Sequence, residues 1–373
     1  MNKRIYLSPP HISGDEKKLL LEAFDSNWIA PLGPNVDAFE KEISNYLRSK
    51  NAVALSSGTA ALHLALVIAG INERDRVLCP SLTFVATANA IKYINAEPIF
   101  IDSDPHTWVC SLDALELAIK KYKPKAFVSV DIYGQSCDYD AIQELCNSHN
   151  VLVIEDAAEA LGSEYKNKKC GSFGEMSILS FNGNKIITTS GGGMLVSKNE
   201  DYIRKAKFLC TQAREPFLHY EHKELGYNYR MSNLLAAVGR GQLAKLDVYV
   251  AKRRKIFQEY QKAFSDIPGV NFITEPTSSK SNNWLTTFTI NPKKSTSNRN
   301  QLIKMLSKEN IESRPVWKPM HLQPLYKNNK YVNIDNNDIS AELFDRGLCL
   351  PSGSSLSVKD QNRVIDIVLS CFR

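Results

Sequence analysis

Short apolar runs recur through the first 200 residues and alternate with segments of helical periodicity. Most of these runs are apolar at successive positions, which is typical of strands covered by helices on both faces. This alternation predicts an α/β domain with a mostly parallel sheet. The predicted strands are 52–55, 76–79, 98–102, 126–131, 151–155, 178–181 and 194–196, and the predicted helices are 15–25, 60–69, 84–93 and 138–149.

The pattern changes after residue 245. Helical periodicity there is interrupted by two stretches rich in β-branched and aromatic residues that alternate with polar ones, which indicates strands. We therefore expect a large α/β domain at residues 1–245 and a smaller C-terminal α+β domain at residues 246–373. Its predicted helices are 245–265, 300–309 and 357–371, and its predicted strands are 270–274 and 285–290.

Composition narrows the class of protein. The chain has 373 residues, with 46 basic against 40 acidic side chains and a formal net charge of +6. It contains no arginine-rich tract and no helix-turn-helix signature, so we expect no nucleic-acid binding. The N-terminus lacks the apolar region of a signal peptide, and no run reaches the ~20 apolar residues that span a bilayer. We expect a cytoplasmic protein without membrane segments.

Cysteine and histidine usage agrees with that expectation. The eight cysteines form no C-x-x-C pair, and several lie in apolar runs, as reduced thiols of a cytoplasmic protein do. His219 and His222 are three residues apart, but their segment is not H-E-x-x-H and no third ligand accompanies it. We therefore expect no metal site.

Candidate chemistry lies where predicted strands end. Lys185 stands between the run at 176–181 and the glycines at 191–193, and Asp156 follows the run at 151–155. This amine and carboxylate can hold pyridoxal phosphate (PLP), because the amine forms a Schiff base with the aldehyde and the carboxylate pairs with the protonated ring nitrogen. Ligands of open α/β sheets bind at such strand ends. A solvated lysine and a helix-capping aspartate are the alternatives.

A phosphate cradle is predicted where one strand leads into a helix near residue 58. Free N–H groups at a helix start, small residues and hydroxyls favour a bound phosphate, and an ordinary N-cap is the alternative. A second strand end supplies a further hydroxyl and an amide. The residues expected at the phosphate are Ser57, Gly58, Thr59, Ser180 and Asn182.

Other side chains have two interpretations each. Phe84 can lie flat on the pyridine ring or belong to the core, and Glu159 can orient ring substituents or lie on the surface. Strand alternation points Glu155 away from Asp156. A Pro-containing segment with aromatic, cationic and imidazole groups suits a nucleotide sugar, or else forms a packed domain junction. Its residues are Trp317, Lys318, Pro319, Met320 and His321.

At these residues the chain resembles the DegT/StrS-type PLP-dependent sugar-nucleotide aminotransferases. The closest likeness is to the branch that installs the 4-amino group of the UDP-bacillosamine precursor. It covers essentially the whole chain, and its most specific stretches are Phe181-Asn-Gly-Asn-Lys185 with Ser190-Gly-Gly-Gly193, Glu155-Asp-Ala-Ala-Glu159 and Gly226-Tyr-Asn-Tyr-Arg230. The resemblance implies an aspartate-aminotransferase-like (type I PLP) fold.

The resemblance also implies site residues. PLP would be attached to Lys185, with Asp156 at the ring nitrogen and its phosphate in the cradle described above. Asn228 would reach the cofactor phosphate of the neighbouring subunit, which implies a homodimer with shared sites. The residues implied for the sugar-nucleotide site are Asn27, Trp28, Ile29, Ala30, Ser57, Trp317, Lys318, Pro319 and Met320.

By the same resemblance, the reaction is a transamination in two halves. L-glutamate gives its amino group, which passes to the 4-keto carbon of a UDP-linked 4-keto-6-deoxy-2-acetamido sugar. The product would be UDP-4-amino-4,6-dideoxy-GlcNAc for bacterial glycan or glycoprotein synthesis. Lys185 argues against the dehydratases of the family, which carry His at that position. A related keto-sugar nucleotide (L-altro series or 3-keto) and a non-catalytic PLP- or sugar-nucleotide-binding regulator are the alternatives.

Overall fold

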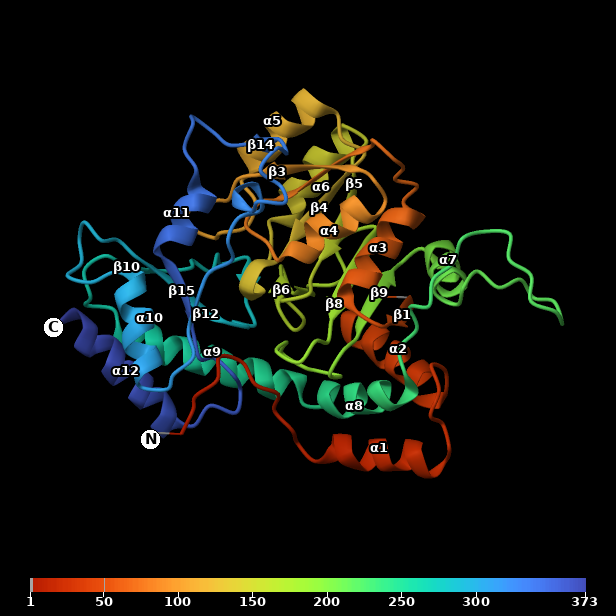
Figure 1. Cartoon of the computed structure of the whole chain (residues 1–373), viewed down its shortest axis with the longest axis horizontal. Helices are drawn as coiled ribbons and strands as arrows, with labels where there is room; N and C mark the ends of the chain where they lie inside the picture. Colours follow the sequence, from red (N-terminus) through yellow and green to blue (C-terminus); the bar gives the residue numbers. More distant parts are fainter. Residues whose placement is uncertain (1–2, 50) are drawn as a thin grey trace.

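An eight-stranded sheet lies at the centre of the larger part of the molecule (Figure 1). The computed structural model describes residues 3–49 and 51–373. In the order β1-β9-β8-β5-β4-β2-β3-β14, neighbours from β8 to β14 are parallel, whereas β9 is antiparallel to β1 and β8. The predicted mostly parallel sheet is confirmed. Its strands are β1 (Asn51–Leu55), β2 (Arg76–Pro80), β3 (Glu97–Ile101), β4 (Ala126–Val130), β5 (Leu152–Asp156), β8 (Met176–Ser180), β9 (Gly193–Ser197) and β14 (Tyr331–Val332).

Helices cover both faces of this sheet, as its apolar strands require. Side chains of α3, α4 and α7 share one core cluster, and those of α2, α5 and α6 share another. Helix α3 is apolar around most of its circumference because it lies between the sheet and two other helices. These helices are α2 (Pro34–Leu47), α3 (Gly58–Ile68), α4 (Val85–Tyr93), α5 (Leu112–Tyr122), α6 (Tyr139–Ser148) and α7 (Glu200–Cys210).

The C-terminal part builds a second, antiparallel sheet in the order β10-β12-β15-β13. Helices α9, α10 and α12 share a core cluster with it, and the long α9 runs along the lower side of Figure 1. Strand β14 returns to the large sheet, where Tyr331 pairs with Phe100. The two parts are therefore joined by a shared sheet as well as by the chain, and the domain division at residue 245 stays a prediction.

The remaining elements complete the chain. Helices α1 and α8 pack against each other at the edge of the large part (Figure 1). A small sheet in the order β11-β6-β7 connects the two parts. The bounds are α1 (Asp15–Asp25), η1 (Ile132–Gly134), β6 (Glu164–Tyr165), β7 (Lys168–Lys169), α8 (Asn233–Leu243), α9 (Leu246–Ala263), β10 (Val270–Phe272), β11 (Ser279–Lys280), β12 (Thr286–Ile290), α10 (Arg299–Lys308), β13 (Arg314–Pro315), η2 (Met320–Leu322), α11 (Ile339–Arg346), β15 (Gly347–Leu350) and α12 (Val358–Phe372).

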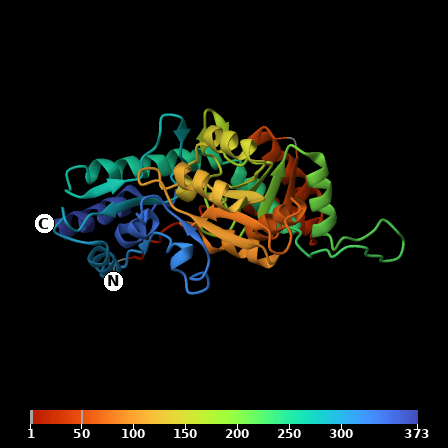
Figure 2. The ribbon, with the colours of Figure 1, turned by 90° about the horizontal axis from the view of Figure 1, so that it is seen from above.

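Between α7 and α8 the chain leaves the body of the molecule as a long excursion, seen at the right of Figure 2. Leu218 and Leu225 on this excursion are almost fully exposed. Nε2 of His219 lies 3.1 Å from Glu221, and Nδ1 of His222 lies 2.8 Å from a backbone carbonyl oxygen. The two histidines therefore have ordinary protein partners on an exposed segment.

All eight cysteines are free thiols, and seven of them are buried. Burial raises the pKa of the Cys79 thiol well above its usual range. Thiols in such surroundings are protonated core side chains rather than nucleophiles. Among the helices of the described residues, none is both long enough and apolar enough to cross a membrane.

Candidate active site

A cavity of about 340 Å³ opens at the carboxyl ends of the parallel strands. This is the position at which open α/β sheets bind ligands. Its walls combine the ends of β5 and β8 with the start of α3 and with aromatic residues of the C-terminal part. The predicted site residues that line it are Ser57, Gly58, Thr59, Phe84, Asp156, Glu159, Ser180, Asn182, Lys185 and Trp317.

The amine of Lys185 is enclosed in this cavity. Its Nζ lies 3.4 Å from Oε1 of Glu159 and 4.2 Å from the centre of the Trp284 ring. The side chain is 11% exposed, so a solvated surface lysine is excluded. A carboxylate and an aromatic face both attract an ammonium group. The loop after β8 therefore holds a cation where a ligand aldehyde could reach it.

Asp156, the last residue of β5, turns its carboxyl toward the same space. Oδ2 accepts a hydrogen bond from Thr87 Oγ1 at 2.8 Å, and Oδ1 accepts one from the amide of Ala158 at 3.2 Å. Burial raises the pKa of this carboxyl to about 6, although the charge of Lys185 acts to lower it. A protonated ring nitrogen nearby would favour the ionised form. A turn rather than a helix follows Asp156, which excludes the helix-capping alternative.

Glu159 connects the amine to the end of β4. Its Oε2 accepts a hydrogen bond from the amide of Tyr133 at 2.8 Å, while Oε1 faces Lys185. The residue is 5% exposed, so the surface interpretation of Glu159 is excluded. The carboxylate can hold the lysine amine toward the cavity.

Three residues that the sequence analysis did not single out also belong to the site: Trp284 lines the cavity, and Tyr133 and Thr87 contact residues that line it. Tyr133 stacks between Trp284 and Trp317, with ring centroids 6.3 and 6.1 Å away, and its hydroxyl accepts a hydrogen bond from the amide of Trp317 at 2.8 Å. Thr87 holds Asp156, as described above. Tyr133 could have been predicted as a site residue from the sequence, because it follows a buried strand closely. Trp284 comes from the other part of the chain, and no local pattern marks it.

The start of α3 forms a narrow cradle with β8 and β9. A Cβ on Gly193 would lie 2.3 Å from the amide nitrogen of Gly58, and one on Gly58 would lie 3.0 Å from Cβ of Ser180. The backbones approach this closely only because both positions are glycine. Ser57 is also the N-cap, since its Oγ accepts a hydrogen bond from the Ala60 amide at 3.0 Å. The N-cap and cradle interpretations are therefore compatible.

Aromatic rings form the rim of the cavity. Phe84 is 49% exposed, so it is not a core residue. Its ring centroid lies 5.4 Å from that of Trp317, with an interplanar angle of 56°. Both rings line the cavity and present apolar surface to it. A planar heterocycle can pack against such a wall.

The residues that follow Trp317 lie away from the cavity. Met320 is buried in the core, and its amide donates to the carbonyl oxygen of Ser81 at 2.7 Å. The His321 ring stacks on that of Tyr331 at 3.8 Å, with Nδ1 2.6 Å from Ser81 Oγ and Nε2 3.0 Å from Asp338. Lys318 is exposed, and Pro319 is buried. In a single chain this segment is a packed junction, and its contact with substrate stays a prediction.

Two further predicted groups lie outside this chain's cavity. Segment 27–30 rests on the start of α8, where the Asn233 amide donates to the carbonyl of Ala30 at 2.8 Å. Asn228 is exposed at the base of the excursion. A separate groove is lined by Trp28 and by Arg230, two residues after Asn228. Both predicted groups therefore lie on one surface of the molecule.

These surroundings fit the parts of PLP. A buried carboxyl at the end of β5 suits the protonated ring nitrogen, whose charge would oppose the effect of burial on its pKa, and an enclosed amine suits the aldehyde. The glycine-lined start of an eleven-residue helix suits the phosphate, and the aromatic rim suits the ring. When bound, PLP supplies an electron sink for negative charge that develops on an adjacent carbon.

Comparison with known proteins gives the family. The model of the DegT/DnrJ/EryC1/StrS aminotransferase family matches residues 10–369. The chain is 52% identical to EpsN of Bacillus subtilis, provisionally named a pyridoxal phosphate-dependent aminotransferase, over 100% of this chain and 97% of that protein. It is 40% identical to a GDP-perosamine synthase of Caulobacter vibrioides, over 97% and 96%.

A solved structure agrees over the whole fold. Helicobacter pylori PseC, an aminotransferase involved in the biosynthesis of pseudoaminic acid, superposes with a TM-score of 0.89 at 28% identity, over 99% of each chain. The expected PLP-aminotransferase fold is thereby confirmed. The chain belongs to the DegT/DnrJ/EryC1/StrS aminotransferase family, and the protein is a PLP-dependent aminotransferase.

Proposed function

We propose that the protein transfers the amino group of L-glutamate to the 4-keto carbon of a UDP-linked 4-keto-6-deoxy-2-acetamido sugar. The product is UDP-4-amino-4,6-dideoxy-GlcNAc. The enclosed triad of Lys185, Asp156 and Glu159 carries the transamination. The sugar assignment rests on the motif likeness, above all the uninterrupted glycines that follow Ser190.

Four residues of the chain have separate roles in this reaction. Asp156 would hold the ring nitrogen of bound PLP, and its ionised carboxylate would favour the protonated nitrogen. Nζ of Lys185 takes the proton from Cα of the amino donor and later returns a proton as the acid. Glu159, 3.4 Å from Nζ, orients the amine. Trp284, packed against the amine, keeps water from that side.

A GDP-linked keto sugar is the second candidate. GDP-perosamine synthases of Caulobacter vibrioides, Escherichia coli O157:H7 and Vibrio cholerae are 40%, 39% and 34% identical to the chain. Their names point to guanosine rather than uridine, whereas the glycine-rich motif favours the UDP branch. The two candidates share the fold and the first half of the reaction, so only the acceptor distinguishes them.

An absorbance titration of the purified holoenzyme tests donor and acceptor together. We expect a yellow protein that bleaches with L-glutamate and recovers its colour with UDP-4-keto-6-deoxy-GlcNAc. NMR of the product identifies the aminated carbon. Faster recovery with a GDP-linked keto sugar would replace the UDP assignment, and a 3-amino product would move the site of amination. A yellow protein that L-glutamate does not bleach would support a regulator.

We further propose that the active form is a homodimer in which Asn228 serves the partner's site. Asn228 is exposed and lies outside its own chain's cavity. It follows an excursion whose large apolar side chains are exposed, and such exposure on one segment is typical of a protein interface. These side chains are Phe217, Leu218, Tyr220 and Leu225.

Mixing two inactive variants tests this sharing. In a mixed dimer of Lys185→Ala with Asn228→Ala, one site receives the intact lysine and the intact asparagine from different chains. We expect activity to rise above that of either parent after subunit exchange. Activity no greater than the average of the two parents would place Asn228 with its own chain's cofactor and contradict the proposal.

A further inference from the structure

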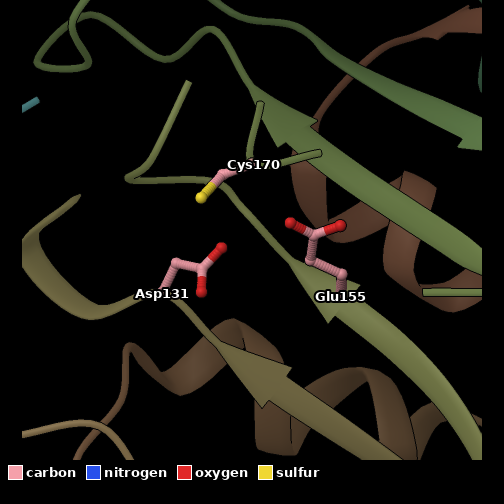
Figure 3. Close-up of side chains that lie close together, drawn as sticks. All are labelled: Asp131, Glu155 and Cys170. Carbon is pink, nitrogen blue, oxygen red and sulfur yellow. The ribbon is translucent and has the colours of Figure 1, made fainter. Parts of the chain in front are cut away.

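A second group of acidic side chains lies on the other side of β5 from the cavity. Glu155 precedes Asp156, so its side chain leaves the opposite face of the strand. There it approaches Asp131, which follows β4, and Cys170 (Figure 3). All three residues are buried, and their carboxyl and thiol atoms lie within 4.8 Å of one another. We call these residues the acid cluster.

Glu155 is bonded at both of its oxygens. Oε1 accepts a hydrogen bond from the amide of Gly171 at 2.5 Å. Oε2 accepts from the amide of Phe173 at 2.7 Å and from Ser177 Oγ at 2.6 Å. Short bonds from several donors are typical of an ionised carboxylate. Glu155 is therefore equipped to carry a negative charge.

Asp131 is bonded at one oxygen only. Oδ1 accepts hydrogen bonds from the amide of Cys137 at 2.9 Å and from the hydroxyl of Tyr139 at 2.8 Å. Oδ2 is buried and has no hydrogen-bond partner among the described residues. An ionised oxygen left in this state costs several kcal/mol. The geometry calls for a hydrogen on Oδ2.

The surroundings offer no counter-charge. In the described part of the chain, no lysine, arginine or histidine forms an ion pair with Asp131 or Glu155. Burial raises the pKa of Tyr139 and of Cys170, and a hydrogen bond with Cys110 raises that of Cys137, so these groups are neutral. A further acid, Glu164, contributes to raising the pKa of Cys170 through its charge and is paired with Lys169 at 2.7 Å.

We propose that Asp131 is protonated at Oδ2 and donates that proton to the Glu155 carboxylate, so the pair carries a single negative charge. Asp131 holds the proton because its Oδ2 has no N–H or O–H donor among the described residues, and the Cys170 thiol that faces this carboxyl is a weak donor. Both Glu155 oxygens, in contrast, accept from N–H or O–H donors. The pair fastens the ends of β4 and β5, where the Asp131 amide also donates to the carbonyl of Asp156 at 3.1 Å. Asp131 and Glu155 are thus positioning residues for Asp156, whichever sugar is the substrate.

A metal ion fits the acid cluster less well than a proton. Three N–H and O–H donors already point at the Glu155 oxygens, and a cation would meet their positive ends. Coordination would also require a thiolate at Cys170, which burial and two acids oppose.

Two isosteric variants test the location of the proton. Asp131→Asn reproduces the neutral acid, because its amide can donate to Glu155 while its oxygen still accepts from Cys137 and Tyr139. Glu155→Gln instead turns an NH₂ group toward an existing donor. For the Asp131→Asn holoenzyme we expect turnover within about twofold of wild type, since the pair's hydrogen bonds remain. For Glu155→Gln we expect at least a tenfold lower yield of folded holoenzyme or a tenfold lower turnover.

Two measurements on wild type and Asp131→Asn separate a shared proton from ordinary packing. The infrared spectrum of wild type minus that of Asp131→Asn should show the carbonyl stretch of a buried carboxylic acid, which only wild type has at this position. Above the pKa of an unfolded aspartate, the native wild type binds one more proton than its unfolded chain. As the pH rises, the unfolding equilibrium constant of wild type divided by that of Asp131→Asn should therefore increase by up to tenfold per pH unit. The increase should stop where Asp131 ionises in the native protein.

Three results would overturn the proposal. These are the absence of the infrared band in wild type, a pH-independent ratio of unfolding constants, and a defect of Asp131→Asn as large as that of Glu155→Gln. Elemental analysis completes the test. A stoichiometric metal in wild-type protein that Asp131→Asn has lost would replace the proton by a cation. If Glu155→Gln fails to fold, the infrared and pH measurements still decide, because they need only wild type and Asp131→Asn.

Discussion

Glu155 and Asp156 are neighbours in β5, yet they lie in two different regions of the molecule. Asp156 borders a 340 Å³ cavity that also contains the amine of Lys185. Glu155 enters the sealed acid cluster with Asp131. Burial raises the pKa of both carboxyls. Burial therefore does not identify a catalytic acid, whereas open volume beside the acid and a reactive partner within it do.

The largest effect should come from removing the reactive partner on the cavity side. For Lys185→Ala we expect turnover to fall by ~10⁴-fold, because both the attachment point of the cofactor and the proton carrier are lost. Product formation measured by mass spectrometry checks this. Lys120→Ala, at an exposed helix position paired with Glu116, is the control and should match wild type. Near-wild-type turnover of Lys185→Ala would refute its role.

Asp156→Asn should give the next largest effect. The amide cannot carry the charge that keeps the ring nitrogen protonated, so we expect turnover to fall by ~10²- to 10³-fold, about 3 to 4 kcal/mol. Cofactor retention during dialysis should weaken as well. The secondary structure should not change, because Asn can still bond Thr87 and Ala158. An unaltered rate would remove Asp156 from the mechanism.

The pH dependence of the apoenzyme tests the environment of Asp156 directly. Its pKa is raised to about 6 in the folded chain, against about 4 when unfolded. Stability from this group is therefore fully present below pH 4 and is lost as the pH rises to 6. Relative to Asp156→Asn, the wild-type apoenzyme should lose about 3 kcal/mol over that interval. Urea unfolding at pH 4, 5, 6 and 7 measures this.

Bound PLP provides the contrast for that experiment. The positive ring nitrogen favours the ionised carboxylate, so the pH-dependent difference should shrink in the holoenzyme. An equal pH dependence in both forms would mean that the ring nitrogen does not face Asp156.

Gly193→Ala tests the packing of the cradle rather than its charge. The added Cβ would lie 2.3 Å from the Gly58 amide nitrogen, so β9 must move away from α3. We expect PLP to bind about 10- to 100-fold more weakly, at a cost of about 1.4 to 2.8 kcal/mol. Gly183→Ala is the matched control, because its Cβ would lie 4.0 Å from the nearest atom, a carbonyl oxygen of Ser190. Equal affinities of the two variants would contradict the cradle.

The sheet could be predicted from sequence because its signal is local. Strands β4, β5 and β8 are apolar at successive positions, and the strands that were predicted match the observed ones to within one or two residues. Helix α8 was not predicted, since Gly239 and Gly241 lower its intrinsic helix propensity. A Cβ on Gly239 would lie 2.7 Å from the Phe39 ring of α2. Close packing on α2 therefore accounts for glycine in this helix.

Site residues could be predicted from the sequence only where a chemically reactive residue type follows a predicted strand. Lys185 and Asp156 follow strands, and the structure brings them into one cavity. Trp284 is 99 residues beyond Lys185 in the chain and meets it only through the tertiary fold. Met320 and His321 have the composition of a binding segment, but their side chains fill the junction between the two parts. Residue type alone does not distinguish a side chain that lines the cavity from one that packs in the junction.

Glu159→Gln should have the smallest effect and sharpens the comparison, because Glu159 joins the cavity to the end of β4. Gln can still accept from the Tyr133 amide, but it lacks the charge that faces Lys185 3.4 Å away. We expect the rate of bleaching by L-glutamate to fall about 10-fold, near 1.4 kcal/mol, with unfolding unchanged within about 1 kcal/mol. Stopped-flow absorbance measures it, with the exposed Glu116→Gln as control. An unaltered rate would make Glu159 a purely structural acceptor, whereas a loss as large as that of Lys185→Ala would make it a proton carrier.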